Sequence, residues 1–216
     1  MSHLKRHAIP KSWPIKRKGT AFVVKPMLGL SNSLPILIIL RDLLKVASNR
    51  KEAKKMIHQK SILLNGRAVR HEKEGVLLFD TITLVPSKKS YRLTILENDK
   101  LNVEEIKESE ANLKIAKIIN KKTLNGKKVQ LNLSDGRNFL SNIKCNVNDS
   151  VLINLKEKKI EKCLPFVEKS EVIVFDGKHS GEKGKIEKID NERKIAEVNN
   201  GGENVSILIK QIMVIK

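Results

Sequence analysis

The chain has 216 residues and a formal net charge of +19, from 43 Lys and Arg against 24 Asp and Glu. Most of this charge lies in residues 1–71, which hold 16 Lys and Arg, six of the nine arginines among them, against only Asp42 and Glu52. So local an excess is typical of a surface that neutralises a phosphate backbone, and arginine suits bidentate phosphate contacts. Lysines also solvate ordinary protein surfaces, so the position of the charge carries the interpretation.

Composition excludes several other classes of protein. The apolar run Leu34–Leu40 is too short to span a bilayer, and no signal-peptide cleavage pattern follows it. Cys145 and Cys163 stand 18 residues apart, which offers neither a zinc knuckle nor a CxxC redox pair, so we expect two reduced thiols. We therefore expect a soluble cytoplasmic protein with no membrane contact, metal or cofactor.

Residues 1–33 form a basic arm in which three prolines and two glycines prevent any helix longer than two turns. Such a strip buries too little apolar surface to offset its ordering entropy, so we expect it to be disordered when free. A disordered arm cannot position an acid–base pair, which makes His3 and His7 poor catalytic candidates. Trp13 either stacks on an unpaired base or anchors the arm on the neighbouring domain, and both alternatives stay open. The candidate RNA contacts of the arm are Lys5, Arg6, Lys11, Trp13, Lys16, Arg17 and Lys18.

Residues 34–90 predict a small domain that contains two helices. An apolar stripe that includes Val46 predicts a first helix from Leu34 to about Ala47. Asn49 stands three residues before Glu52, an arrangement typical of a capping box, and begins a second helix. We expect this helix to turn its apolar residues inward and its cations outward; the residues concerned are Ala53, Met56 and Ile57 inside, and Arg50, Lys51, Lys54 and Lys55 outside.

A β-hairpin follows the second helix. Ser61–Leu64 predicts a strand, Asn65-Gly66 predicts a tight turn, and Thr81–Val85 predicts a later strand. Helices and hairpin in this order resemble the alpha-L RNA-binding domain of ribosomal proteins, pseudouridine synthases and tyrosyl-tRNA synthetases. The resemblance implies a basic patch on structured RNA, although a charged helix face is a solvated surface in most proteins. The matching residues are Arg50, Lys51, Lys54, Lys55 and Arg67, to which we add Arg41 and Arg70 as candidates.

Residues 91–170 predict a central antiparallel β domain, because short β segments alternate there with turn residues such as Asn125-Gly126 and Asp135-Gly136. Arg137 follows the second turn and is a further candidate RNA contact. Val103–Ser109 carries an acidic run, which we expect to be an exposed helix or loop that faces away from RNA. These carboxylates have no histidine or phosphate-binding loop beside them, which favours a solvated face over catalysis or metal binding.

Residues 171–216 predict a small β-barrel with a glycine-containing loop. The loop does not fit a P-loop, since Gly184-Lys185 is followed by Ile186. It resembles the KOW motif, in which a glycine ends a tight loop before a G-x-I/V strand. Lys178, His179 and Lys183 would point outward from this loop toward RNA. His179 has no nucleophile or orienting acid at a readable spacing, which argues against catalysis.

The order of arm, alpha-L module, β domain and KOW barrel resembles the small-subunit ribosomal protein family "S-four-e" of archaea and eukaryotes, over essentially the whole chain. The segments that carry the resemblance are His3-Leu4-Lys5-Arg6, Pro10, Trp13-Pro14-Ile15, Arg17-Lys18, Ser33-Leu34-Pro35, Leu40-Arg41-Asp42, Glu52-Ala53, Asn65-Gly66, Asp135-Gly136-Arg137-Asn138 and Gly177-Lys178-His179. The resemblance implies an α+β fold and a structural role in the small subunit, with ribosomal RNA and neighbouring ribosomal proteins as partners and no catalysis or small-molecule substrate. The short end after the KOW strands is typical of archaeal members.

The chain departs from the family pattern at three places. It has Leu28-Gly29-Leu30-Ser31 where the family has Pro-Gly-Pro-His, Asn65 where it has Asp, and Ser134 where it has the His of a His-Asp-Gly run. An RNA contact through that histidine is therefore not expected here.

Two other classes of protein compete with this interpretation. A pseudouridine synthase would need an Arg-Leu-Asp context on a large catalytic domain, and only Leu40-Arg41-Asp42 comes near it. A KOW-type transcription or translation factor would bind transiently. Sedimentation separates these classes, because a ribosomal protein stays in the small subunit after a high-salt wash.

Overall fold

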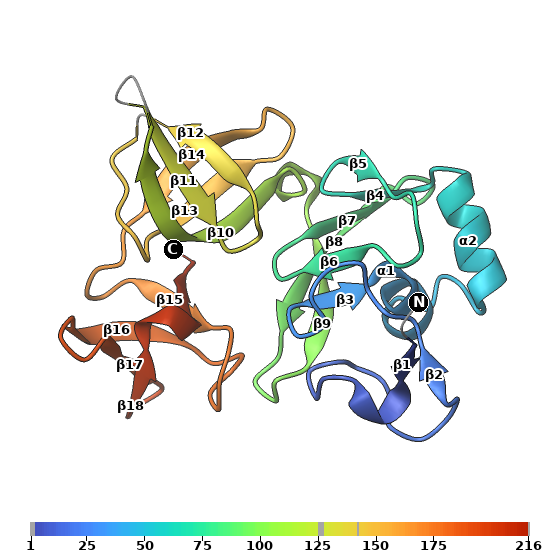
Figure 1. Cartoon of the computed structure of the whole chain (residues 1–216), viewed down its shortest axis with the longest axis horizontal. Helices are drawn as coiled ribbons and strands as arrows, with labels where there is room; N and C mark the ends of the chain where they lie inside the picture. The colour runs from blue at the N-terminus through green and yellow to red at the C-terminus, as the bar shows by residue number, and fades with distance from the viewer. Residues whose placement is uncertain (1–2, 125–127, 142, 216) are drawn as a thin grey trace. The chain divides into compact units, whose positions relative to one another are not determined.

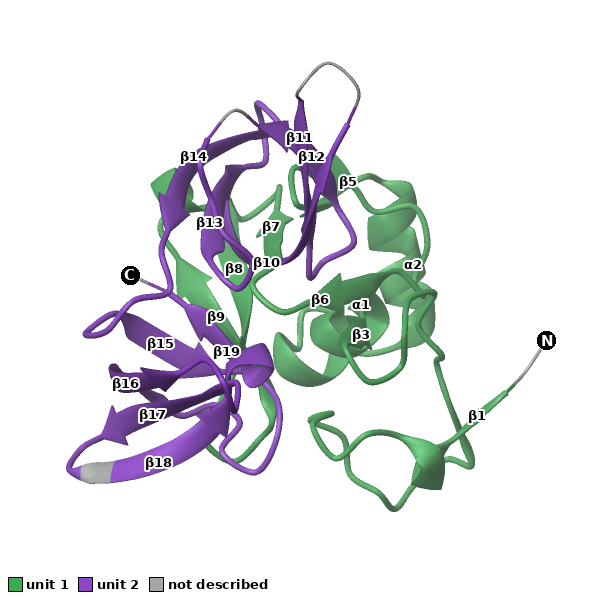
Figure 2. Cartoon of the chain, turned by 60° about the vertical axis from the view of Figure 1, so that its left-hand side comes forward, with its two compact units in different colours: residues 1–112 green, residues 113–216 purple. Residues whose placement is uncertain are grey.

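The computed structural model describes residues 3–124, 128–141 and 143–215. The chain divides into two compact units, residues 1–112 and 113–216 (Figure 2). Both units are mostly β (Figure 1). The expected α+β class agrees with this composition, and the expected Asn125-Gly126 turn lies outside the described residues.

The first unit is built on a five-stranded antiparallel sheet in the order β5-β4-β7-β8-β9, with the small pairs β1-β2 and β3-β6 beside it. Its strands are β1 (Leu4–Lys5), β2 (Phe22–Val23), β3 (Ser33–Pro35), β4 (Ile62–Leu64), β5 (Arg67–Ala68), β6 (Gly75–Leu77), β7 (Thr81–Leu84), β8 (Lys89–Ile95) and β9 (Leu101–Ile106). Its helices are α1 (Ile36–Ile38) and α2 (Arg50–His58).

The first helix differs from the expected amphipathic stripe. It runs through α1 and a π-helical turn over Ile39–Leu43, and Ile36 to Leu40 are all buried. A helix that is apolar all round is buried all round, which the uninterrupted apolar run allows. Lys45, with φ of 54°, ends the helix before Val46, whose side chain is 45% exposed. The stripe through Val46 and the helix end near Ala47 were therefore wrong.

The second helix and the hairpin are confirmed. The Asn49 side chain accepts a hydrogen bond from the Glu52 backbone N–H, and the Glu52 carboxylate accepts one from the Ser48 N–H. Ala53 and Ile57 face the core. Asn65 and Gly66 both have positive φ, 52° and 75°, as a two-residue hairpin turn requires.

The acidic stretch is only in part the expected exposed helix or loop. Residues 103–106 belong to strand β9, which corrects the expectation, whereas Glu108–Glu110 form an exposed 3-10 helix. Strand β9 pairs with β8, and β8 pairs with β7, so both continue the sheet of the first unit. The expected boundary near residue 90 therefore differs from the division at Asn112. Glu104 and Glu105 stay exposed, and Leu101 is the residue of β9 that is buried. Adjacent residues of a strand point to opposite faces, so the two acids lie in water on both faces of β9, and the strand packs on the core nearer its start, at Leu101 and Val103.

The second unit contains two five-stranded antiparallel sheets, in the orders β12-β11-β10-β13-β14 and β18-β17-β16-β15-β19. The strands of the first sheet are β10 (Leu113–Thr123), β11 (Val129–Leu133), β12 (Asn138–Ser141), β13 (Ser150–Asn154) and β14 (Lys159–Leu164). Those of the second are β15 (Glu171–Val174), β16 (Lys183–Asp190), β17 (Ile195–Asn200), β18 (Glu203–Leu208) and β19 (Ile212–Val214). The first sheet curls until Cα atoms of its edge strands β12 and β14 approach within 8 Å. Each sheet covers its own apolar cluster.

Gly184 lies where β16 passes close to β17. A Cβ atom at this position would overlap the Asn199 carbonyl oxygen and stand 2.6 Å from a methyl group of Val198. Backbone approach this close leaves room only for glycine.

Candidate nucleic-acid interface

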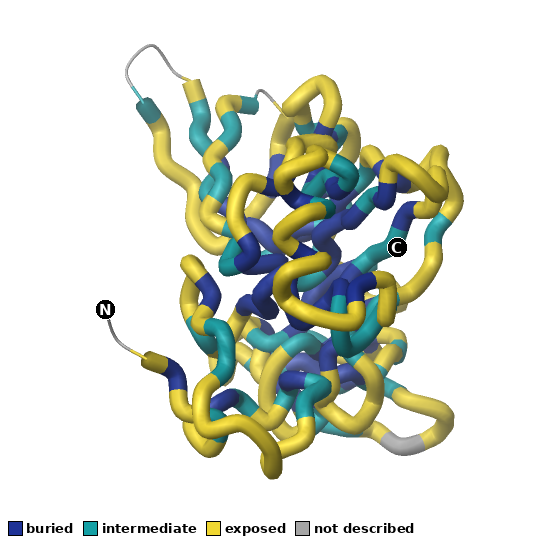
Figure 3. Tube along the Cα trace, turned by 90° about the vertical axis from the view of Figure 1, so that its right-hand side faces the viewer, coloured by how far each residue is buried: buried dark blue, intermediate teal, exposed yellow. Residues whose placement is uncertain are grey.

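The basic arm is ordered in the described residues, contrary to expectation. Leu4, Ile9 and Trp13 are buried in the apolar core of the first unit, and buried stretches alternate with exposed ones along the arm (Figure 3). The Leu101 N–H also donates to the Ser12 carbonyl at 2.8 Å. These three side chains, together with partly buried apolar residues of the arm and its backbone hydrogen bonds, attach the arm to the core of the first unit.

Trp13 is the anchor of the arm, and its proposed role as a base-stacking residue was wrong. The side chain is 2% exposed and packs in the core that also holds α1. An indole ring enclosed on both faces has no free surface for a base. The alternative of an anchor on the neighbouring domain is the one the structure adopts.

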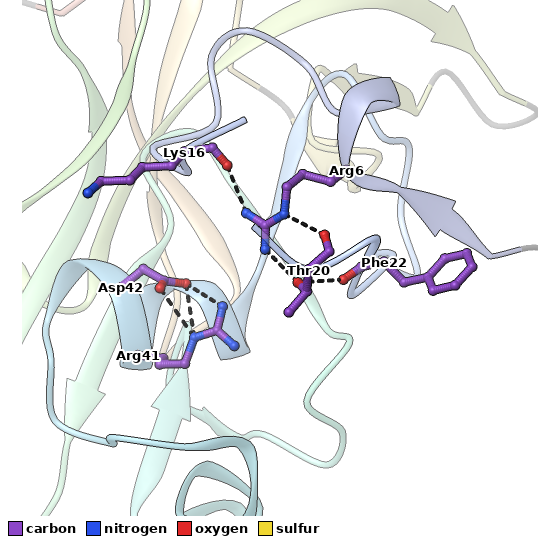
Figure 4. A network of polar contacts seen from close by, with 6 residues as sticks. All are labelled: Arg6, Lys16, Thr20, Phe22, Arg41 and Asp42. Atoms are coloured by element: carbon purple, nitrogen blue, oxygen red, sulfur yellow. Dashed lines mark hydrogen bonds and ion pairs between the residues drawn. The ribbon is translucent and has the colours of Figure 1, made fainter. Parts of the chain in front are cut away.

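Arg6 closes the loop of the arm that carries most of its cations. Its Nε donates to the Thr20 carbonyl at 2.7 Å, its Nη1 to the Lys16 carbonyl at 2.7 Å, and its Nη2 to the Thr20 hydroxyl at 2.6 Å (Figure 4). The guanidinium therefore holds the arm itself rather than pointing into solvent. Within the described residues the other candidate cations of the arm are exposed and have no ion-pair partner; these are Lys5, Lys11, Lys16, Arg17 and Lys18.

Arg41 is also engaged within the protein. Its guanidinium pairs with the adjacent Asp42 carboxylate at 2.8 Å, and both side chains are about one-third exposed (Figure 4). A nearby carboxylate offsets the attraction of Arg41 for a phosphate.

The cations of α2 fall into two groups. Arg50 forms a two-pronged ion pair with Glu72, whose side chain is 2% exposed, and the Lys54 ammonium stands 3.8 Å from the same carboxylate. The hydrogen bonds from Arg50 hold the pKa of Glu72 below its usual value, although burial opposes this, and the same contact raises the pKa of Arg50. Lys51 and Lys55 are exposed and have no ion-pair partner in the described chain.

Two further cations follow the Asn65-Gly66 turn. Arg67 begins β5, and Arg70 lies two residues after that strand ends. Both are exposed, and their guanidinium groups have no partner among the described residues. The ion pair between Arg50 and Glu72 joins the start of α2 to the segment just beyond Arg70. The first unit therefore brings the helix and the segment after the hairpin together on one side.

The candidate cations of the second unit are partly neutralised. Arg137 lies 3.5 Å from Asp135, which is 4% exposed and pairs with the buried Lys114 at 2.8 Å. His179 does not point freely outward, because its Nδ1 lies 2.9 Å from the Glu182 carboxylate. Lys178 and Lys183 are exposed and have no partner within the described part of the chain.

Sequence reasoning missed two features of the described chain. Phe22 of β2 is exposed. It was not among the candidate RNA contacts, although it lies in the arm that carries no acid. Lys117 of β10 is 3% exposed, and its ammonium donates to the carbonyl oxygens of Ile209 and, at 2.8 Å, Ile212. Burial lowers the pKa of Lys117 to about 8. The signal that could have identified Lys117 is its position in a strand, among residues whose side chains face the protein interior.

The described residues bring no three metal-ligating side chains together. They also include no helix that is long and apolar enough to cross a membrane. Cys145 and Cys163 are free thiols, and burial raises the pKa of Cys163 to about 12. What the described surface of the first unit offers chemically is a set of exposed cations on ordered backbone.

Comparison with known proteins gives the family. Residues 87–160 match the family described as "Ribosomal family S4e", and residues 2–29 match the RS4NT (NUC023) domain. The small ribosomal subunit protein eS4 of Methanocella arvoryzae is 39% identical over 87% of this chain and 81% of its own length. That of Methanothermobacter thermautotrophicus is 41% identical over 87% of this chain and 78% of its own length.

The fold is also that of a solved relative. The crystal structure of the 30S ribosomal protein S4e from Thermoplasma acidophilum superposes with a TM-score of 0.74, at 24% identity, over 86% of this chain and 95% of that one. This is a family of ribosomal structural proteins and not of enzymes, which excludes the pseudouridine synthase alternative. The chain belongs to the small ribosomal subunit protein eS4 family.

Proposed function

We propose that this chain is a structural constituent of the small ribosomal subunit, where it binds ribosomal RNA and supports assembly and translation in the cytoplasm. The observation that carries the proposal is the net charge of +14 in residues 1–71 of a chain that belongs to the eS4 family. Such an excess repels itself and attracts a polyanion, whose phosphates neutralise it.

The RNA face consists of the cations that the protein leaves unpaired. Arg6 and Arg50 hold the arm and α2 in position, while the exposed lysines contact phosphates as point charges and the exposed arginines bind them in bidentate geometry. Because these cations form no ion pair in the described chain, their full charge is available to RNA phosphates. The face comprises Lys5, Lys11, Lys16, Arg17 and Lys18 of the arm and Lys51, Lys55, Arg67 and Arg70 beyond it. Lys54 adds to it, with part of its charge offset by Glu72.

The finer domain assignments are part of the proposal. Residues 34–90 act as an alpha-L module, which the capped helix α2 and the positive-φ turn of Asn65 and Gly66 support. Residues 171–216 act as a KOW-type module, which the tight approach of β16 at Gly184 supports. Lys178 and Lys183 of this module contact RNA or a neighbouring ribosomal protein.

The direct test is the salt dependence of RNA binding by the double variant Lys51→Gln, Lys55→Gln. Each lost phosphate contact flattens the slope of log K against log salt by about 0.9 on duplex RNA, taken as for duplex DNA, or about 0.7 on single strands. We expect a total flattening of about 1.4 to 1.8, measured by filter binding to small-subunit ribosomal RNA. The matched control replaces Lys156 and Lys158, exposed lysines in the turn between β13 and β14, and should keep the wild-type slope. Equal slopes for all three chains would contradict the assignment of α2 to the RNA face.

A second measurement separates a ribosomal constituent from a factor that binds transiently. After a wash in high salt, we expect the chain to sediment with the small subunit. Complete release into the supernatant would contradict a structural role.

A further inference from the structure

The β1–β2 ribbon of the arm carries an exposed aromatic ring. Leu4 pairs with Val23 and Lys5 pairs with Phe22. Because side chains alternate along a strand, Leu4 turns into the core while Lys5 and Phe22 share the outer face. Phe22 is 55% exposed, and the ring of His3 lies against it with the centroids 5.3 Å apart and the planes at 52°. The outer face of the ribbon is thus a pair of rings beside an ammonium group.

The ring of Phe22 is held on ordered backbone. The Thr20 hydroxyl donates to the Phe22 carbonyl at 3.2 Å, and Arg6 binds both the hydroxyl and the carbonyl of Thr20 (Figure 4). The backbone N–H of Arg6 also donates to the Ala21 carbonyl at 2.9 Å. The same guanidinium that closes the cationic loop therefore also fixes the strand that presents Phe22.

The charge around this ring identifies its partner. The first 41 residues carry no acid, and Lys5 stands directly opposite Phe22 with no ion-pair partner in the described chain. A partner protein surface of ordinary mixed charge gains little here, whereas a nucleic acid offers phosphates for Lys5 and π faces for Phe22. An unpaired base is required, because a base inside a duplex has no free face.

We propose that Phe22, supported by His3, is a stacking platform for an unpaired base of ribosomal RNA, with Lys5 on a flanking phosphate. This proposal rests on the proposed function and adds the position at which single-stranded RNA is read. Stacking on an aromatic ring tolerates every base, so the platform selects an unpaired nucleotide rather than a sequence. It takes the role that the sequence had suggested for Trp13.

The test compares three variants in binding to protein-free small-subunit ribosomal RNA. Phe22→Leu keeps an apolar side chain but removes the π face, and it should weaken binding by about 5- to 140-fold, which converts a stacking energy of about 1–3 kcal/mol. Phe22→Tyr keeps the ring and should bind like the wild type. Met27→Ala removes another exposed apolar side chain of the arm, 65% exposed, and should also bind like the wild type. The salt slope of Phe22→Leu should equal that of the wild type, since no charge is lost.

The other outcomes overturn the proposal in distinguishable ways. If the wild type fails to bind this RNA, the proposed function itself fails. If the wild type and Phe22→Leu bind equally, only the platform fails. If Phe22→Leu binds the naked RNA normally but fails to assemble when the other small-subunit proteins are added, the ring contacts a protein and the proposal is wrong. Circular dichroism of each variant checks that a loss of affinity is not a loss of fold.

Discussion

The buried lysine of the second unit makes the stability of that unit depend on pH in a calculable way. Lys117 of β10 is the register partner of Ser150 of β13. Its ammonium binds the Ile209 and Ile212 carbonyls, and the Ser150 hydroxyl accepts the Val214 N–H at 3.0 Å. These contacts attach β19 and the turn before it to the curled sheet, so Lys117 joins the two sheets of this unit.

The magnitude follows from the pKa of Lys117, which burial lowers from 10.5 to about 8. Between these values the unfolded chain holds a proton at this site that the folded chain has released, so stability rises with pH. Below pH 8 the buried ammonium of Lys117 lowers the free energy of unfolding by its full amount, and this destabilisation is removed as pH rises through about 10.5. A difference of 2.5 units corresponds to about 3 kcal/mol of unfolding free energy. The neutral amine still has two N–H groups for the two carbonyls, so the contacts survive deprotonation.

The perturbation is Lys117→Met, which removes the titrating group at similar length. At neutral pH its net effect is small, because relief of the buried charge opposes the loss of donors to two carbonyls, at about 1–3 kcal/mol each. The informative quantity is the difference in unfolding free energy between wild type and variant, measured in urea by circular dichroism from pH 7 to 10.5. Between pH 7 and 10.5 this difference should change by about 3 kcal/mol in favour of the wild type. The other lysines are common to both chains, so their titration cancels in the difference.

The fluorescence of Trp13 provides the internal control for this experiment. It is the single tryptophan of the chain and lies in the core of the first unit, so its transition should not respond to the variant. A difference that stays flat from pH 7 to 10.5 would refute the reasoning, because it would mean that the ammonium is not desolvated in the folded state.

Three further substitutions test the fold that carries the RNA face. Trp13→Ala should cost about 3–5 kcal/mol in a circular-dichroism melt, whereas an unchanged melting temperature would mean that the ring is no anchor. Glu72→Gln should cost about 1.5–3 kcal/mol at pH 7 in urea unfolding. Because the pKa of Glu72 is lowered in the folded state, this penalty should begin to shrink as pH falls below the ordinary value of 4.5 and should vanish as pH falls through the lowered pKa; a penalty that does not shrink at all by pH 3 would contradict the pairing with Arg50. Gly184→Ala should cost about 1–3 kcal/mol, while Gly29→Ala, with no atom within 4 Å of its Cβ, should cost little in the same assay; equal costs would refute the close-approach argument.

The parts of the fold that the sequence could predict are those whose causes are local. The α2 helix begins at Asn49 because the cap and Glu52 lie within one turn, and the hairpin forms because Asn65 and Gly66 both accept positive φ. The strands of the second unit follow from short β segments that alternate with turn residues such as Asp135-Gly136. No distant contact is needed to decide any of these.

The parts that could not be predicted depend on distant partners. Leu4, Ile9 and Trp13 follow no helical or strand period, so only the core of the first unit reveals that they are buried. Arg50 is counted as a surface cation until Glu72, 22 residues away, is seen beside it. The assignment of β8 and β9 to the first sheet depends on pairing with β7, which short turn signals leave open.

The division of labour between arginine and lysine changes what the charge of the first unit means. Arginine in residues 1–70 is the stronger sign of RNA binding in the sequence, yet Arg6, Arg41 and Arg50 bind the protein's own carbonyls and carboxylates. The forked guanidinium groups of Arg6 and Arg50 fix the arm and the start of α2, and that of Arg41 is paired with the adjacent Asp42. Lysine is then the more numerous free cation of the RNA face, beside Arg17, Arg67 and Arg70. Lysine contacts phosphates as a point charge and carries little geometric selectivity. Selectivity for one RNA site must then come from the fixed shape of this surface and from groups that read an unpaired base, which is the role we assign to Phe22.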